Sequence, residues 1–122
     1  MNRAQYMREA DKLFMAQFRF KPCGVCGRAK WGTKPTVGHH LLPRSVYRMH
    51  RYNPDNMYPL CVVHHDWAEI SPDEFDEWLF ENDPDTAAWI TENKHHRNEE
   101  KLNYKAIYEQ LLEEEETKKE DK

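Results

Sequence analysis

The sequence predicts a small α+β domain. Two short segments of strand-forming residues lie between longer segments with helical periodicity. The 122-residue chain is hydrophilic, with 39% apolar and 33% charged residues, so the hydrophobic core that it can bury is small. Cysteine and histidine residues recur in pairs at metal-ligand spacing, and small domains with little core commonly add metal ions. We therefore expect a metal-stabilised domain.

The first half of the chain is expected to contain both strands. Residues 3–19 place apolar side chains at helical spacing, which predicts an amphipathic helix. Residues 21–32 are rich in turn formers. The strand candidates are residues 36–42 and 57–60, joined by a long irregular and basic connection. A helix is expected to begin near Cys61.

Three further helices are expected in the C-terminal half. A helix over residues 71–81 opens with the capping-box pattern SPDE, with proline at the first helical position. A helix over residues 83–94 opens with Asp-Pro in the same way. A last helix over residues 102–115 follows the Asn-Glu-Glu of residues 98–100. The strongly charged end, residues 113–122, is expected to fray.

These elements indicate a single domain over residues 1–122. An N-terminal helix (residues 1–19) precedes a metal-binding core (residues 20–82). A helical extension with an acidic tail follows (residues 83–122).

Charge is divided unevenly along the chain. The net charge is −4, but residues 1–52 contain eleven Lys/Arg and two acidic residues, a net charge of +9. Residues 53–122 carry −13. A basic half that flanks the metal-ligand pairs can neutralise phosphates. The alternative is that these charges are simply solvated side chains on the exposed faces of helices.

Cysteine use and hydropathy indicate a reducing, aqueous compartment. The three cysteines cannot all pair with one another, and Cys23 and Cys26 are too close in sequence for a typical structural disulfide. No apolar run approaches the roughly 18–20 residues that span a membrane, and no signal-peptide pattern opens the chain. We expect a soluble, cytoplasmic protein with no membrane partner.

The first ligand set is Cys23-x-x-Cys26 together with Cys61-x-x-His64. The first pair has the glycine-containing form of a zinc knuckle, and the second spacing suits the start of a helix. A Cys3His set leaves no position for water, which predicts a structural zinc ion. The alternative is an apolar Cys61 and a free CxxC pair.

A second set, His39, His40, Asn56 and His65, interleaves with the first. Hydrolysis of a phosphodiester requires a base that deprotonates water and a cation that stabilises the transition state and the leaving oxygen. Adjacent side chains on a strand point to opposite faces, so one of His39 and His40 can bind the cation while the other faces the water. Asn56 can bridge backbone groups across the loop or orient the base directly.

Glu69 is the candidate for a third ligand of this cation. His65 adjoins His64, so a fold around zinc also orients His65. Glu69 follows His65 by four residues and lies on the same helical face. Asp66 is a weaker competitor, and Glu69 is alternatively an exposed helix acid.

The segments Cys23–Cys26, Gly38–Ser45 (GHHLLPRS) and Asn56–His65 (NMYPLCVVHH) together resemble the HNH endonucleases. The resemblance covers roughly residues 20–70. It implies a ββα-metal (HNH, or His-Me finger) core with a zinc knuckle, flanked by an N-terminal helix and C-terminal helices. The chain also loosely resembles small phage-type members of that family.

The resemblance implies a role for each residue of the second set. His39 stands at the first metal-ligand position and His65 at the last. His40 stands at the general base, and Asn56 at the asparagine for which the family is named. The implied cation is one divalent ion, Mg²⁺, Mn²⁺, Ni²⁺ or Zn²⁺. Some members have histidine where Glu69 stands.

The same resemblance assigns Cys23, Cys26, Cys61 and His64 to the zinc positions found in many members. A fourth cysteine is usual where this chain has His64, which remains a competent zinc ligand.

Basic residues near the second set are expected to contact a phosphate backbone. Arg44 and Ser45 directly follow the base and can meet phosphates on either side of the cut. Further candidates are Lys34, Arg48 and Arg51, each of which is alternatively an ordinary loop charge.

The expected function is metal-dependent hydrolysis of DNA, double-stranded or branched, leaving 5′ phosphate and 3′ hydroxyl as the family typically does. The expected location is the cytoplasm of a bacterial host or phage-infected cell, and the sequence leaves the identity of any protein partner open. One alternative is a non-catalytic, zinc-stabilised nucleic-acid-binding module. Another is a protein-interaction adaptor built on the acidic C-terminal helices.

Several other aromatic and histidine residues are expected to have structural roles. The pair His95-His96 suits the negative end of a helix dipole, and His50 is expected at the surface. For Trp31, both packing within the protein and stacking on a nucleic-acid base remain open. Core packing is expected of the tryptophans at positions 67, 78 and 89.

Overall fold

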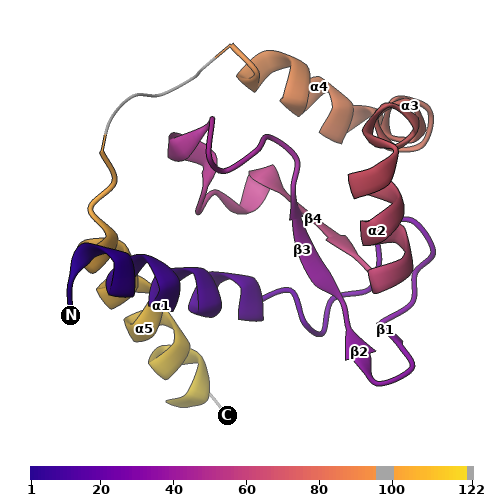
Figure 1. Ribbon diagram of the computed structural model, residues 1–122. Coiled ribbons are helices and arrows are strands. Elements are labelled where there is room, and N and C mark those ends of the chain that lie inside the picture. Colours follow the sequence, from indigo (N-terminus) through magenta and orange to yellow (C-terminus); the bar gives the residue numbers. More distant parts are fainter. Residues whose placement is uncertain (96–100, 121–122) are drawn as a thin grey trace.

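Two antiparallel strand pairs and five α-helices form the parts of the chain that the computed structural model describes, residues 1–95 and 101–120 (Figure 1). The predicted α+β class is therefore confirmed. Within these residues no helix is both long enough and apolar enough to cross a membrane.

The central strand pair consists of β3 (Val37–His40) and β4 (Met57–Leu60). Its register places His39 opposite Tyr58 and His40 opposite Met57. The second strand begins and ends where the sequence predicts, whereas the first is shorter than residues 36–42.

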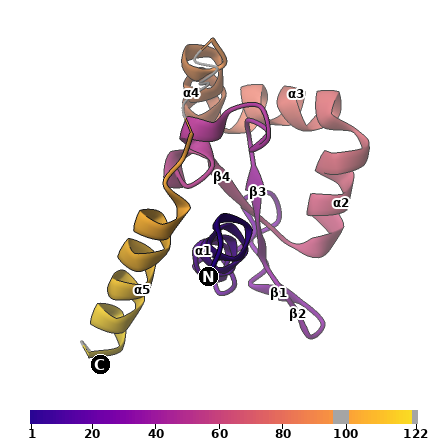
Figure 2. The ribbon, with the colours of Figure 1, turned by 60° about the vertical axis from the view of Figure 1, so that its left-hand side comes forward.

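Helices cover both faces of this strand pair. The α1 helix (Arg3–Ala16) lies on one face, and α2 (Val62–Ile70) and α3 (Pro72–Asn82) lie on the other (Figures 1 and 2). Alternate residues of β4 serve the two faces, since Met57 packs with Phe14 and Phe18, while Tyr58 packs with Phe75. The same alternation sends His39 and His40 to opposite sides.

The α1 helix ends three residues before the predicted boundary at position 19. Its first turn is closed by a reciprocal capping box between Asn2 and Gln5. Beyond Ala16 the chain turns so that Phe18 can pack against the strand pair. A Cβ atom at Gly38 would lie 2.8 Å from the Phe18 ring, so this close approach requires glycine.

The α3 helix begins at Pro72 as predicted, but the predicted capping box does not form. The Ser71 hydroxyl makes no capping hydrogen bond, because Ser71 also terminates α2 and donates its N–H to the Trp67 carbonyl at 2.8 Å. The Glu74 carboxylate instead accepts a hydrogen bond from Trp67 Nε1 at 3.0 Å. A single residue therefore joins two helices, and this fixes their relative orientation.

The α4 helix (Pro84–Asn93) closes over the irregular connection between the strands. Asp83 caps it through the Thr86 N–H and also accepts the Tyr58 hydroxyl at 3.0 Å. The ring of His50 lies 5.2 Å from that of Trp89 and is only 4% exposed. The expectation that His50 lies at the surface is wrong, because α4 covers it.

The α5 helix (Tyr104–Glu120) differs from its prediction at both ends. It begins at Tyr104, two residues after the predicted start at position 102. The preceding residue, Asn103, caps the helix by accepting a hydrogen bond from the Ala106 N–H at 3.1 Å. It continues to Glu120, so the expected fraying from position 113 is wrong within the described residues. Glutamate and lysine are good helix formers, and spacings such as Glu114 to Lys118 favour the helix further. Residues 98–100 and 121–122 lie outside the described parts.

Candidate metal sites and the adjoining cleft

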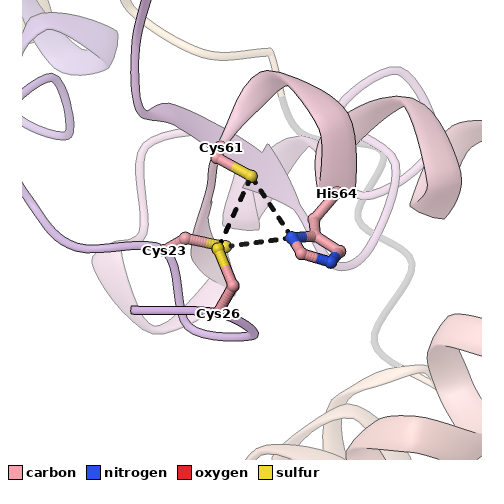
Figure 3. A group of neighbouring side chains, drawn as sticks. All are labelled: Cys23, Cys26, Cys61 and His64. Atoms are coloured by element: carbon pink, nitrogen blue, oxygen red, sulfur yellow. Dashed lines mark hydrogen bonds between the residues drawn. The ribbon is translucent and has the colours of Figure 1, made fainter. Parts of the chain in front are cut away.

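The side chains of Cys23, Cys26, Cys61 and His64 converge from two segments of the chain (Figure 3). The Cys26 and Cys61 sulfurs are 3.8 Å apart. His64 Nδ1 lies 3.2 Å from the Cys61 sulfur and 3.7 Å from that of Cys23. In a zinc tetrahedron with Zn–S bonds of about 2.3 Å, neighbouring ligand atoms are about 3.5–3.8 Å apart. The cluster therefore fits a metal ion such as zinc.

Local structure explains how the first cysteine pair is held. Gly27 donates its N–H to the Cys23 carbonyl at 2.8 Å and has φ of +76°, which a non-glycine residue would adopt only with strain. Burial opposes ionisation of the Cys23 thiol, but backbone N–H groups of Cys61 and Cys26 lower its pKa below the usual value. A low thiol pKa favours the thiolate form that binds metals.

The second pair is held by the start of α2. Cys61 is the residue before the helix, fully buried, and His64 lies in the first turn. The spacing of three residues brings both ligand atoms to one side of that turn. The next residue, His65, consequently points about 100° further round the helix.

A second cluster joins β3 to α2. Ligand atoms of His39, His65 and Glu69 all lie within 4.8 Å of one another. Glu69 Oε1 is 3.2 Å from His65 Nε2 and 3.8 Å from His39 Nδ1. Two imidazoles and one carboxylate form a ligand set that leaves coordination positions open, unlike the closed Cys3His set. Asp66 is exposed and does not belong to this cluster.

The environment of His39 favours its neutral form. Its ring packs edge-on against Phe75 and lies 5.4 Å from the His65 ring. Burial, followed by the charge of His65, lowers the pKa of His39 to about 4, while Glu69 acts in the opposite direction. A neutral imidazole retains the lone pair that binds a cation.

His40 lies on the α1 side of the strand pair, with its ring 6.5 Å from that of Phe14. His40 Nε2 donates a hydrogen bond to the Arg51 carbonyl at 3.0 Å, because a carbonyl only accepts. The lone pair of the neutral ring is therefore on Nδ1. Burial lowers the pKa of His40 despite this hydrogen bond, and the charges of Arg44 and Arg51 lower it further.

A cleft of about 670 Å³ brings both histidines of β3 to one solvent-filled space. His65, Glu69, Pro72 and Asp76 line it from α2 and α3, and Met15 lines it from α1. Although strand alternation sends the two histidines to opposite faces, the cleft extends along β3 and contacts both.

Asn56 is completely buried and bridges backbone groups. Its Oδ1 accepts the Leu42 N–H at 2.8 Å, and its Nδ2 donates to the carbonyls of Leu42 and His50. Of the two roles left open by the sequence, these contacts favour bridging of the loop over direct contact with His40. Asn56 therefore holds the ends of the connection together.

The five residues expected to contact a phosphate backbone differ in where they lie and how exposed they are. Arg44 and Ser45 are exposed and line the cleft. Arg48 is exposed on a short 3₁₀ helix (Arg48–His50), and Lys34 is exposed on β2 (Lys34–Pro35); neither lines the cleft. Arg51 does not fit the expected surface contact, because its side chain is 9% exposed and occupied by an ion pair.

That ion pair involves Asp11, a site residue that the sequence analysis missed. Its carboxylate accepts hydrogen bonds from Arg51 Nε at 3.1 Å, from Arg51 Nη2 at 2.7 Å and from the Tyr52 hydroxyl at 2.8 Å. Arg44 Nη1 lies 3.7 Å away. The one available signal was that Asp11 is, with Glu9, one of two acidic residues in the basic half.

The remaining aromatic predictions are largely confirmed. Trp67 and Trp78 pack against the main core, and Trp89 packs against His50. Trp31 is 39% exposed, with the Arg28 guanidinium 4.3 Å from its ring centre. His95 is exposed just beyond α4, as expected of a helix-end residue. His96 lies outside the described residues.

Comparison with protein-family models, with curated proteins and with solved structures found no match to this chain. The resemblance to HNH endonucleases therefore depends on the residues and spacings of this chain alone.

Proposed function

We propose that this protein is a metal-dependent endonuclease of the HNH type that hydrolyses phosphodiester bonds of DNA. One observation carries the proposal: a single cleft contains a His2Glu ligand cluster and, next to it, a histidine whose free ring nitrogen is Nδ1. The proposal includes a ββα-metal core in which β3, β4 and α2 are the two strands and the helix. It also includes zinc in the Cys3His cluster as a structural ion.

His40 is the proposed general base. The Arg51 carbonyl holds the proton on Nε2, so Nδ1 can accept the proton of a water molecule in the cleft. Because burial lowers the pKa of His40 below the ordinary value for histidine, the neutral form that can act as a base predominates near pH 7. The water oxygen forms a bond to phosphorus as the bond to the 3′ oxygen breaks, and the water proton passes to His40 Nδ1. The leaving 3′ oxygen takes a proton from bulk water, so the products are a 5′ phosphate and a 3′ hydroxyl.

His39, His65 and Glu69 would hold the divalent ion that this reaction needs. When bound, the ion supplies Lewis-acid stabilisation of the phosphoryl oxygen and of the leaving 3′ oxygen. The low pKa of His39 favours binding, since its imidazole does not have to lose a proton at neutral pH.

Arg44 and Ser45 are the proposed phosphate contacts within the cleft. Arg44 is more than half exposed, so its guanidinium can turn towards a phosphate on either side of the cut. Asn56 acts through the loop that supplies both the Arg51 carbonyl and the cleft wall. It is a positioning residue, because it does not contact the reacting atoms.

The test is cleavage of supercoiled plasmid by the full chain with Mg²⁺, Mn²⁺ or Ni²⁺. We expect nicked or linear product that EDTA abolishes and the divalent ion alone restores. His40→Ala should lower the rate about 10²–10⁴-fold while zinc content and melting temperature are retained. His95→Ala is the matched control, since it removes an exposed histidine outside the cleft and should leave the rate unchanged.

Two outcomes would contradict the proposal. Undiminished cutting by His40→Ala would remove His40 from the role of base. A folded, zinc-loaded protein that binds duplex DNA but never cuts it would favour the alternative, a non-catalytic nucleic-acid-binding module.

A further inference from the structure

A short β-hairpin precedes the cleft and is not used by the proposed reaction. It consists of β1 (Lys30–Trp31) and β2 (Lys34–Pro35), paired antiparallel with Trp31 opposite Lys34. Gly32 opens its two-residue loop with φ of +62°, whereas the second loop residue, Thr33, does not have positive φ, which indicates a type II′ turn. Figure 1 shows the hairpin projecting from the end of the sheet.

One face of this hairpin combines an aromatic ring with two cations. Residues directly opposite in an antiparallel pair share a face, so Trp31 and Lys34 lie side by side. The Arg28 guanidinium lies 4.3 Å from the centre of the Trp31 ring. Trp31 and Lys34 are exposed, as is Arg28.

Within the side chains that the structure describes, neither Arg28 nor Lys34 is part of an ion pair, in contrast to Lys12, Arg44 and Arg51. The two acidic residues among residues 1–52 are both on α1, and one of them already holds Arg51. Exposed, unpaired cations around an aromatic ring favour a polyanion with stacking or sugar surfaces.

The hairpin is fixed at one end of the cleft. Thr36 is 1% exposed and donates its hydroxyl to the Ala29 carbonyl at 3.1 Å, which ties the base of the hairpin together. The next residue, Val37, begins β3 and lines the cleft. His39 follows Lys34 by five positions, so their Cα atoms are at most about 18 Å apart. That distance corresponds to about five base pairs of duplex rise.

We propose that the hairpin binds the phosphate backbone of duplex DNA on one side of the bond that is cut. Arg28 and Lys34 contact phosphates within about five base pairs of the scissile bond, and Trp31 packs against the adjoining sugars. Arg44 and Ser45 lie beyond the other end of β3, so the cut bond lies between two groups of backbone contacts. This proposal rests on the proposed nuclease function.

The test measures the binding of a fluorescein-labelled 30-base-pair duplex to the full chain carrying His40→Ala. Fluorescence anisotropy reports Kd at each of several salt concentrations. Arg28→Gln with Lys34→Gln should raise Kd about tenfold at 0.1 M salt. It should lower the slope of log Kd against log salt by about 2, one for each lost phosphate contact. The melting temperature should not change, since both side chains are exposed.

The matched control is Lys105→Gln with Lys118→Gln on α5, which removes the same charge from two exposed lysines far along the chain. A control that loses the same affinity and slope would mean that only net charge matters, and the proposal would be wrong. Wild-type Kd and slope in the hairpin variant would overturn it as well.

The outcomes separate the two proposals. If the unmodified protein cuts plasmid, and Arg28→Gln with Lys34→Gln binds normally in the His40→Ala background and cuts normally with His40 intact, the hairpin proposal alone fails. If the hairpin variant binds weakly but the unmodified protein never cuts, the backbone contact of the hairpin stands, whereas the nuclease function fails and with it the position of that contact beside a cut bond. If the unmodified protein does not bind duplex DNA at all, both fail.

Discussion

Asp11 shows how a single carboxylate can position a proposed catalytic base that it does not contact. It accepts two hydrogen bonds from the Arg51 side chain, and the Arg51 carbonyl in turn accepts a hydrogen bond from His40 Nε2. Burial would otherwise oppose a charged guanidinium at this position, but the hydrogen bonds that Arg51 donates to Asp11 raise the pKa of Arg51. The ion pair therefore connects α1 to the orientation of His40.

Replacement of Asp11 should destabilise the protein far more than replacement of the other acidic residue on α1. Asp11→Ala leaves the buried Arg51 charge and the Tyr52 hydroxyl without their acceptor, so we expect a loss of about 2–3 kcal/mol. Glu9→Ala removes only an exposed contact with Lys12 and should change stability by less than about 0.5 kcal/mol. Urea unfolding measures both variants, and equal losses would contradict the role of Asp11.

The α2 helix is the element that links the two ligand clusters. Its first turn carries His64 of the Cys3His cluster, the next residue is His65, and Glu69 follows one turn later. Whatever holds the start of this helix also sets the direction of His65. Since the described core is small, an ion at the helix start would contribute much of the stability of the fold.

Loss of one zinc ligand should therefore unfold or strongly soften the domain. Zinc bound to four such ligands contributes on the order of 10–16 kcal/mol of apparent binding free energy. This equals or exceeds the free energy of unfolding of a whole domain, which is roughly 5–15 kcal/mol. We expect one zinc per chain in the unmodified protein, with Cys26→Ala losing both the zinc and the cooperative thermal transition.

A ligand exchange provides the control for that experiment. His64→Cys keeps four zinc ligands and should retain the ion and the melting transition, whereas His64→Ala should lose both. An unaltered melting temperature in Cys26→Ala, measured with zinc analysis of the same sample, would count against a structural ion.

At the scale of the whole molecule, the acidic C-terminal helix α5 packs against the N-terminal helix α1, which lies in the basic half of the chain. The α5 helix lies alongside α1 in both views (Figures 1 and 2), and the rings of Tyr6 and Tyr108 are 5.7 Å apart. Arg3 donates to the Leu102 carbonyl and lies 4.5 Å from the Tyr104 ring centre. Leu111 packs against the apolar cluster beneath α1. This arrangement gives the C-terminal helix a structural role, whether or not it also binds a partner.

A chain that ends at residue 103 should consequently be less stable and, under the proposed function, less active. Removal of α5 exposes the apolar cluster and takes away Tyr104, which is 8% exposed, so we expect a loss of at least about 3 kcal/mol. A chain that ends at residue 116 keeps Tyr104 and Leu111 and loses the exposed side chains of Thr117 and Lys118, so it should change stability by less than about 0.5 kcal/mol. Plasmid cutting and urea unfolding are measured together. Normal stability of the shorter chain would contradict the structural role.

Elements with strong local signals were predictable from the sequence. Strand β4 and the start of α2 follow from turn formers and periodicity, and helix geometry alone places Cys61 beside His64 and His65 beside Glu69. Strand alternation likewise sends His39 and His40 to opposite faces before any fold is known. The capping box expected at Ser71 did not form, because that residue already terminates the preceding helix.

By itself, then, the sequence determined the α+β class and the spacing of neighbouring ligands within each segment, because these depend on periods of two or 3.6 residues along the chain. Only the tertiary structure decided that Asp11 occupies Arg51 across 40 positions, that α4 buries His50, and that α5 packs on α1. Such contacts depend on which surfaces remain uncovered once the local elements have formed. The periodicity of an element shows which of its faces is apolar, but it does not show which other element packs on that face, since many partners could cover it.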